Sequence, residues 1–348
     1  MKYNFEKIIE CVPNFSVGED KRTIDLICNK INSVEYSKVL DVYSDNDTNR
    51  SVITFITTPD NLINTSFNAI KVALENINME THSGVHPRIG AVDVFPIIPL
   101  KNISLKKCIS LSKILGKKVS TELFLPVYLY GYSASSQSRI RLENVRRGEY
   151  EGLEDKIKNK KLTPDYGKDF FNKKSGATII GVRNLLIAYN VNLNSSSKII
   201  AQNIAKKIRE SGYIKTNKNG HILYDNNKQP QREYGKLKNC KAIGWYSNKY
   251  KKAQVSFNIT SFLDTPLHTL FDLTYVEALK NNVKVSGSEI VGLVPKDALL
   301  YSGKFYNKKN NKKKFSEKQL IELAVNKLGL NDLNDFNLNK KIIENFIL

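Results

Sequence analysis

Two histidines in one short glycine-containing stretch are the clearest candidates for proton-transfer chemistry in the sequence. We call residues 81–90 the histidine loop; it contains His82 and His86, two of the four histidines in the chain. Because Pro87 disfavours the helical conformation for the residue before it, we expect His86 in extended backbone. A neutral imidazole with a pKa near ~6.5 can accept a proton and return it at neutral pH. The loop therefore predicts a general base at His86, with a His-Pro turn of no catalytic role as the alternative.

Charged residues beside the histidine loop could complete such a site. Asp93 offers a carboxylate to orient the imidazole ring, and Arg88 offers a guanidinium that could receive a carboxylate of the substrate. His82 is expected to cap the end of the preceding helix, where a histidine interacts favourably with the helix dipole. We interpret the remaining two histidines, His221 and His268, as structural or surface residues.

A second polar cluster runs from Asp41 to Arg50, between two β-branched segments. Its Asp-x-Asn-x-Asp spacing suggests a calcium loop, but the glycine and the later bidentate glutamate of such loops are missing. A polar hairpin loop with Asx turns is one interpretation. The other is substrate binding, with Arg50 and Asp41 as the candidate contacts.

A third candidate is the stretch 164–176, which places aromatic residues beside lysines. Such a mixture suits a flat, acidic ligand through stacking and charge. A plain linker between two domains has a similar composition and is the alternative.

Nine short sequence blocks, spread along the chain, occur in the same order as in a known protein family. They are Glu10–Ser16, Asp47–Arg50, Gly84–Asp93, Leu125–Gly131, Arg147–Glu151, Pro164–Gly167, Gly176–Thr178, Ala253–Asn258 and Gly287–Pro295. Together these blocks resemble glutamate formimidoyltransferase, over residues 8 to 302 approximately. The joint occurrence of so many blocks makes an accidental match improbable.

The resemblance implies transfer of a formimino group from N-formimino-L-glutamate to N5 of tetrahydrofolate, which serves as co-substrate, with no metal. It implies that His86 is the catalytic histidine, taking the N5 proton and returning it to the departing glutamate nitrogen. Arg50, Arg88, Asp41 and Asp93 are then the candidate substrate contacts. The family's folate-binding stretch falls on Gly167, Lys168, Asp169, Phe170, Phe171, Asn172, Lys173, Lys174, Ser175 and Gly176. This stretch and Tyr43, where some relatives carry an acidic residue, depart from the family pattern.

Two other functions compete with this interpretation. Formyl transfer between 5-formyl-tetrahydrofolate and glutamate could use the same site. A non-catalytic basic RNA-binding protein would suit the formal charge of +20. The chain lacks an aromatic RNA-binding motif of the sheet type, however, and the lysine-rich tract 304–314 is typical of a solvated surface. We therefore expect no nucleic-acid partner.

Composition limits the compartment and the partners. The four cysteines have no metal-ligand spacing, and the first residues lack the basic and apolar regions of a secretory signal. No apolar run approaches the ~18 residues needed to span a membrane. We expect a cytoplasmic protein with reduced thiols. The resemblance adds a homodimer and a separate cyclodeaminase that acts on the product.

The elements that must position these residues follow from hydrophobic periodicity. In the first half we expect strands at Ile8–Val12, Lys38–Tyr43, Ser51–Thr57 and Val92–Leu100, with helices over Asp20–Ile31 and from Pro59 to Ile77. In the second half we expect strands at Ala177–Leu193, Cys240–Tyr246, Gln254–Thr260 and Glu289–Val294, with helices over Ser195–Glu210 and from Asp264 to Lys280. Between these sets, residues 136–160 suggest a charged helical stretch, and residues 213–236 an excursion on the surface.

The repeated order strand, helix, strand, strand, helix, strand predicts an α+β protein. We expect two related ferredoxin-like (βαββαβ) subdomains that face one another across a cleft, plus a helical C-terminal tail. The expected bounds are 1–178 for the first subdomain, 179–302 for the second, and 303–348 for the lysine-rich tract and tail.

Overall fold

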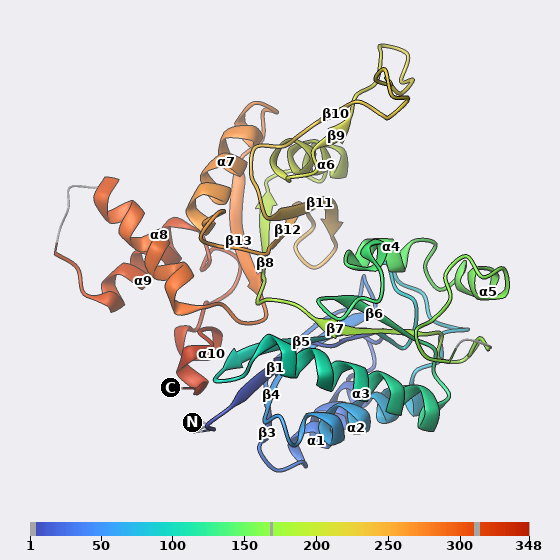
Figure 1. Cartoon of the computed structure of the whole chain (residues 1–348). Coiled ribbons are helices and arrows are strands. Elements are labelled where there is room, and N and C mark those ends of the chain that lie inside the picture. The colour runs from blue at the N-terminus through green and yellow to red at the C-terminus, as the bar shows by residue number, and fades with distance from the viewer. Residues whose placement is uncertain (1–4, 168–169, 310–313, 348) are drawn as a thin grey trace. The chain divides into compact units, whose positions relative to one another are not determined.

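The computed structural model describes residues 5–167, 170–309 and 314–347. The chain forms two compact units, the first ending at Leu185 and the second running from Leu186 to Phe346 (Figure 1). Each unit combines helices with one principal sheet, as the sequence predicts. No helix among the described residues is both long and apolar enough to cross a membrane.

The first unit is built on a mixed sheet. Its strands are β1 (Ile8–Cys11), β2 (Asn14–Phe15), β3 (Ser37–Asp45), β4 (Arg50–Thr57), β5 (Val92–Lys101), β6 (Val127–Gly131) and β7 (Thr178–Val182). β1 and β2 both pair with β4 and β5, so they act as one strand interrupted at Pro13. β3 extends the antiparallel side beyond β4, whereas β7 and then β6 extend the other side by parallel pairing.

Three helices cover one face of this sheet: α1 (Lys21–Asn32), α2 (Leu62–Asn76) and α3 (Leu105–Leu123) (Figure 1). α1 begins at Asp20, whose carboxylate accepts hydrogen bonds from the backbone and hydroxyl of Thr23. Its buried side chains Ile24, Ile27 and Ile31 recur at helical spacing and join the core of the unit. The predicted helices and strands of this half are confirmed, with small shifts at their ends.

The stretch 136–160 is helical only in part, so the prediction of a helical stretch is confirmed for short segments and wrong for the residues between them. It contains a single 3₁₀ turn, η1 (Gln137–Arg139), and two short helices, α4 (Leu142–Arg146) and α5 (Leu153–Lys158). Gly148 and Glu149 between them have positive φ angles of 84° and 53°, which an α-helix does not allow. The chain therefore turns sharply after α4.

The second unit has the same order of elements. Its elements are β8 (Ile187–Leu193), α6 (Lys198–Ile208), β11 (Cys240–Ser247), β12 (Lys252–Ile259), α7 (Leu267–Leu279) and β13 (Val285–Val291). The four strands form an antiparallel sheet in the order β11, β12, β8, β13. The predicted strand over 177–193 is in fact two strands, because β7 belongs to the first unit and β8 to the second. The last strand begins earlier than predicted.

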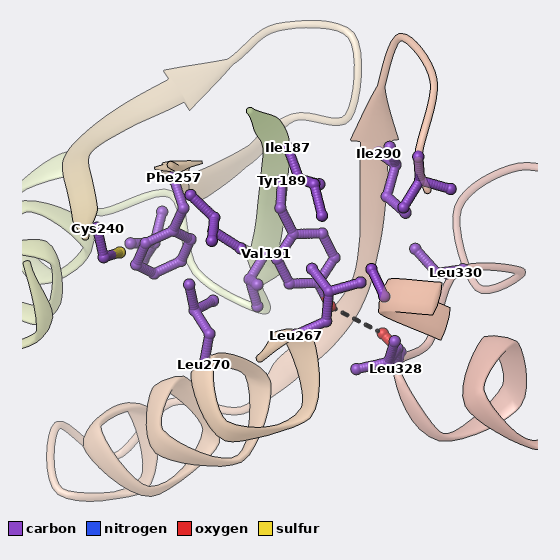
Figure 2. Close-up of a cluster of buried hydrophobic side chains, with 14 of the residues drawn as sticks. Ile187, Tyr189, Val191, Cys240, Phe257, Leu267, Leu270, Ile290, Leu328 and Leu330 are labelled. Atoms are coloured by element: carbon purple, nitrogen blue, oxygen red, sulfur yellow. Dashed lines mark hydrogen bonds between the residues drawn. The ribbon is translucent and has the colours of Figure 1, made fainter. Parts of the chain in front are cut away.

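The rest of the second unit consists of a hairpin and the C-terminal helices. The exposed hairpin contains β9 (Tyr213–Ile214) and β10 (Arg232–Glu233), within the predicted surface excursion. The helices are α8 (Lys296–Lys309), α9 (Glu317–Lys327), α10 (Leu338–Lys341) and α11 (Glu344–Ile347). In the core of this unit, the hydroxyl of the fully buried Tyr189 bonds Ser288 Oγ at 2.9 Å. The same hydroxyl reaches the Leu328 carbonyl at 3.4 Å (Figure 2). This contact attaches the C-terminal segment to the sheet.

Candidate active site

Three loops of the first unit meet where the candidate residues lie. They are the segment after β2, the turn between β3 and β4, and the histidine loop before β5. A small pocket between them is lined by Ser16, Thr48, Asn49, Arg50, His82, His86, Arg88 and Asp93. Four residues named from sequence, His86, Arg50, Arg88 and Asp93, are thus brought together. Between these lining residues no space large enough for a water molecule remains.

The histidine loop and the turn between β3 and β4 lie so close together that only glycine fits at position 84. A Cβ atom on Gly84 would lie 2.4 Å from the carbonyl oxygen of Thr48, so a larger residue would push the loops apart. Asn49 joins all three loops, because its amide donates to the Ser83 carbonyl at 3.1 Å and its oxygen accepts from the Gly18 amide at 2.8 Å. The turn after β3 therefore holds the histidine loop in place.

His86 is in contact with Arg50. Nη1 of Arg50 lies 2.6 Å from Nε2 of His86. A guanidinium can only donate, so Nε2 must be the acceptor and the proton of the neutral ring must sit on Nδ1. In the described part of the chain Nδ1 has no hydrogen-bond partner of good geometry. The lone pair that a general base needs is thus occupied by a cation.

The surroundings of His86 favour the neutral imidazole. Burial lowers the pKa of His86 well below its usual range, and the positive charges of Arg50 and Arg146 lower it further, while the adjacent Pro87 backbone opposes the shift. His86 as a whole residue is only half-buried, so solvent moderates the size of the effect. The direction means that His86 is uncharged at neutral pH.

Asp93 does not orient the ring of His86, contrary to the prediction. Its side chain is 1% exposed, forms an ion pair with Arg146 of α4, and accepts a hydrogen bond from the Ile89 amide at 3.1 Å. Both contacts hold the end of the histidine loop against the sheet. Asp93 therefore acts on His86 through the backbone of the loop.

Arg88, like Asp93, is bound by other residues of the protein. Its guanidinium makes two hydrogen bonds to Glu151, at 2.9 and 2.7 Å, and lies 3.4 Å from Glu149. The nitrogen Nε of Arg88 donates to His82 Nδ1 at 3.3 Å, and His82 Nε2 lies 3.0 Å from the Asn49 carbonyl oxygen. Since α2 already ends at Asn76, His82 does not cap that helix, and the prediction for His82 was wrong.

The second half of the predicted folate-binding stretch lies beside the histidine loop. Gly176 forms an antiparallel bridge with Gly90, and the Ala91 amide donates to the Ser175 carbonyl at 2.9 Å. Gly176 has a φ of 69°, and a Cβ there would lie 2.2 Å from the Ile89 carbonyl oxygen. The stretch turns at Asn172, whose side chain accepts from the Ser175 amide at 2.9 Å. Lys168 and Asp169, two members of the predicted stretch, lie outside the described residues.

Comparison with known proteins identifies this arrangement. Residues 8–183 match the N-terminal subdomain of the formiminotransferase domain, and residues 188–348 match the formiminotransferase domain itself. The chain belongs to the formiminotransferase family. It is 39% identical to the glutamate formimidoyltransferase of Thermoplasma acidophilum, over 87% of this chain and 93% of that protein. It is 34% identical to the glutamate formimidoyltransferase of Streptococcus pyogenes serotype M1, over 98% of this chain and 99% of that protein.

Longer relatives belong to the same family. The formimidoyltransferase-cyclodeaminase of Dictyostelium discoideum is 40% identical over 97% of this chain, and the chain spans 60% of its length. The similarity to formiminotransferases therefore covers nearly the whole chain but little more than half of this relative.

Not every family position predicted for the site reaches the pocket. Asp41 lies on β3 opposite Thr54 and is absent from the residues that line the pocket. Conversely, sequence reasoning missed the roles of Arg146 and Glu151. The block Arg147–Glu151, which the formiminotransferase resemblance already included, contains Glu151 and was the available signal for it, whereas Arg146 lies just before that block. Among the described residues, no three His, Cys, Asp or Glu side chains are grouped so as to hold a metal ion.

Proposed function

We propose that this chain transfers a formimino group from N-formimino-L-glutamate to N5 of tetrahydrofolate, giving 5-formimino-tetrahydrofolate and L-glutamate. The observation that supports this most directly is the neutral His86, placed by three converging loops in a pocket lined with arginine. Two relatives that match nearly their whole length are named glutamate formimidoyltransferase.

His86 would move one proton in this reaction. Nε2 accepts the proton of N5 as the bond from N5 to the formimino carbon forms. The same atom then donates this proton to the glutamate nitrogen as the bond between carbon and that nitrogen breaks. The ring starts and ends neutral, which agrees with surroundings that disfavour the imidazolium.

We assign folate binding to residues 167–176. The described part of this stretch pairs with the end of the histidine loop, so a ligand held there lies near His86. Phe171 packs against Tyr150 with ring centroids 5.8 Å apart, and Lys173 and Lys174 are exposed. Half-buried aromatic rings beside exposed lysines suit a flat ring with an acidic tail.

Arg50 is the best candidate to bind a carboxylate of the amino-acid substrate. It borders His86 directly, and no carboxylate of the described residues pairs with it. Arg88 is a weaker candidate, because Glu151 and Glu149 already occupy its guanidinium.

The finer architecture and setting are also proposals. The strand order β3, β4, β1, β5 in one unit and β11, β12, β8, β13 in the other supports two ferredoxin-like subdomains. From the family resemblance we propose that they face one another across a folate-binding cleft. We further propose a cytoplasmic homodimer whose product is passed to a separate cyclodeaminase.

The test is a turnover assay with purified protein. Absorbance is followed after mixing with tetrahydrofolate and N-formimino-L-glutamate, and in parallel with 5-formyl-tetrahydrofolate and L-glutamate. Turnover that needs both substrates of the first pair, and exceeds that of the second pair, supports the proposal. Turnover with the second pair alone would replace it by formyl transfer.

A further inference from the structure

The contact between Arg50 and His86 blocks the atom on which the proposed reaction depends. Nε2 of a neutral imidazole has one lone pair, and the N–H of Arg50 at 2.6 Å is directed at it. The lining side chains of the pocket leave no room for a water molecule. The arrangement seen here is therefore closed to a proton donor, and Arg50 must move before His86 can act as a base.

Arg50 is half-buried and, in the described part of the chain, lacks the carboxylate partner that a guanidinium in such surroundings usually has. Its Nε is buried without a hydrogen-bond partner, and among the described residues no carboxylate lies within ion-pair distance of it. Asp93, the carboxylate whose charge acts most strongly on Arg50, is bound to Arg146. Burial and the charge of Arg146 lower the pKa of Arg50, and the charges of Asp93, Tyr43 and Asp45 offset this only in part, so the surroundings disfavour the cation. Such a group attracts an anion, because a charge buried without a partner is costly.

We propose that a carboxylate entering the pocket binds Arg50 and draws it away from His86, so that ligand binding itself uncovers the base. This inference rests on the proposed function and deepens it by assigning Arg50 a positioning role in addition to binding. A carboxylate can accept two parallel N–H bonds from a guanidinium, including one from Nε, whereas the imidazole accepts one. We call this change of partner at Arg50 the exchange. It replaces the neutral imidazole, which accepts one hydrogen bond from Arg50, by a charged carboxylate that accepts two.

The exchange would also adjust the chemistry of His86. In the closed arrangement the positive charge of Arg50 opposes protonation of the ring. A bound carboxylate neutralises that charge and raises the pKa of His86 toward its ordinary value, near which a group can both accept and return a proton. The free enzyme thus keeps a weak base, and the complex has a competent one.

The carboxylate could come from the amino-acid substrate or from the glutamate tail of folate, and binding experiments distinguish these sources. Long-range ¹H–¹⁵N spectra of ¹⁵N-histidine-labelled protein report the tautomer and titration of each ring, and His86→Asn identifies the His86 signals. The probes are N-acetyl-L-glutamate, its diamide, 5-formyl-tetrahydrofolate, and the counterpart of this folate that lacks the glutamate tail.

In the free protein we expect the Nδ1–H tautomer of His86, with no protonation between about pH 5.5 and 8, where an ordinary histidine titrates. N-acetyl-L-glutamate should shift the midpoint of His86 upward by about one unit or more, and its diamide should not. A response to the folate but not to N-acetyl-L-glutamate would assign the carboxylate to the folate tail.

Arg50→Gln provides the matched variant. Because burial is the largest cause of the lowered pKa of His86, the titration midpoint of His86 in this variant should rise above its wild-type value without reaching the ordinary one, and it should no longer respond to N-acetyl-L-glutamate. Arg22→Gln, an exposed change of the same charge on α1, should leave the wild-type response intact. The inference is overturned if free wild-type His86 titrates normally, or if saturating carboxylate leaves its midpoint and tautomer unchanged.

These outcomes separate the inference from the proposed function. A responsive His86 in a protein without formimino transfer would uphold the exchange at Arg50 and reject the reaction. Formimino transfer in a protein whose His86 does not respond would uphold the reaction and reject the exchange.

Discussion

Each unit of the molecule holds one histidine whose pKa is lowered, but the residues around the two histidines differ in kind. His86 lies in loops, among three arginines, with its lone pair bound by Arg50. His268 lies on α7 in the second unit, 5% exposed, with its ring stacked 4.0 Å from that of Phe305. Burial is the largest cause of the shift at both.

The difference is that Nδ1 of His268 has a hydrogen-bond partner, whereas two buried nitrogen atoms at the His86 site have none in the part of the chain that the structure describes. Nδ1 of His268 lies 3.3 Å from Ser302 Oγ, and that hydroxyl donates to the Ala298 carbonyl, so the ring donates to Ser302. Around His86, by contrast, Nδ1 of the ring and Nε of Arg50 remain without partners among the described residues. A buried histidine alone therefore says little about function, whereas unsatisfied polar atoms around it indicate a ligand site.

The sharpest test of this contrast is removal of each imidazole in turn. His86→Ala should lower kcat by about 10² to 10⁴, the usual contribution of a general base, with the melting temperature little changed. His268→Gln should instead lower the melting temperature and leave kcat near that of the wild type. Steady-state kinetics and thermal unfolding of both variants check this. Wild-type turnover in His86→Ala would remove the general-base assignment.

The next largest effect concerns the buried pair behind the histidine loop. Asp93→Asn keeps an acceptor for the Ile89 amide but leaves Arg146 without its counter-charge. Breaking a buried ion pair in this way costs about 3 to 5 kcal/mol, so we expect a large fall in the free energy of unfolding. Urea unfolding gives the value directly.

Replacing both partners by neutral residues is the control for Asp93. The double variant with Arg146→Met should recover much of the lost stability, because no buried charge is then left unpaired. If Asp93→Asn alone were as stable as the wild type, the pair would not hold the loop, and the fixed position of His86 would need another explanation.

A smaller effect is expected in the pH dependence of stability. A histidine whose pKa is lower in the folded than in the unfolded state stabilises the fold fully above the unfolded value, near ~6.5, and this contribution is lost as pH falls below it. For His268 the nearby Asp272 opposes the shift and is itself hydrogen-bonded to Tyr306 at 2.9 Å. Between pH 7.5 and about 5, the free energy of unfolding should therefore decrease less with falling pH in His268→Gln than in the wild type. Urea unfolding at a series of pH values measures this decrease. An equally steep fall in both would assign the pH dependence to other groups.

Sequence reasoning predicted the parts of the site that local chemistry specifies. His86 was found because glycines and a proline surround it, and Arg50 because it ends a run of aspartates and asparagines. The order of strands and helices followed from periodicity, which is also a local property. The pairing of Asp93 with Arg146 was missed, because these residues are 53 positions apart and no periodic pattern joins them.

The errors have the same origin. The stretch 136–160 was predicted as helical from its charged composition, yet the turn at Gly148 and Glu149 is fixed by contacts with the distant histidine loop. One of these contacts is a hydrogen bond from the Tyr150 amide to the Arg88 carbonyl at 2.8 Å. His82 was predicted as a cap although the helix was expected to end at Ile77, and in the structure its ring instead contacts Asn49 and Arg88. Tertiary contacts, which one sequence does not display, decided both.

The smallest effect is expected at the edge of the site, where Glu151 pairs with Arg88. The side chain of Glu151 is 64% exposed, so Glu151→Gln should cost less than about 1 kcal/mol, and less still at high salt. Glu149 remains near Arg88, so the loop should keep its place and kcat should stay within about twofold of the wild type. Glu154→Gln, which removes an exposed pair with Lys158 on α5, is the matched control. A collapse of turnover in Glu151→Gln but not in Glu154→Gln would mean that the hydrogen bonds of Arg88 position His86 as firmly as the buried pair of Asp93 does.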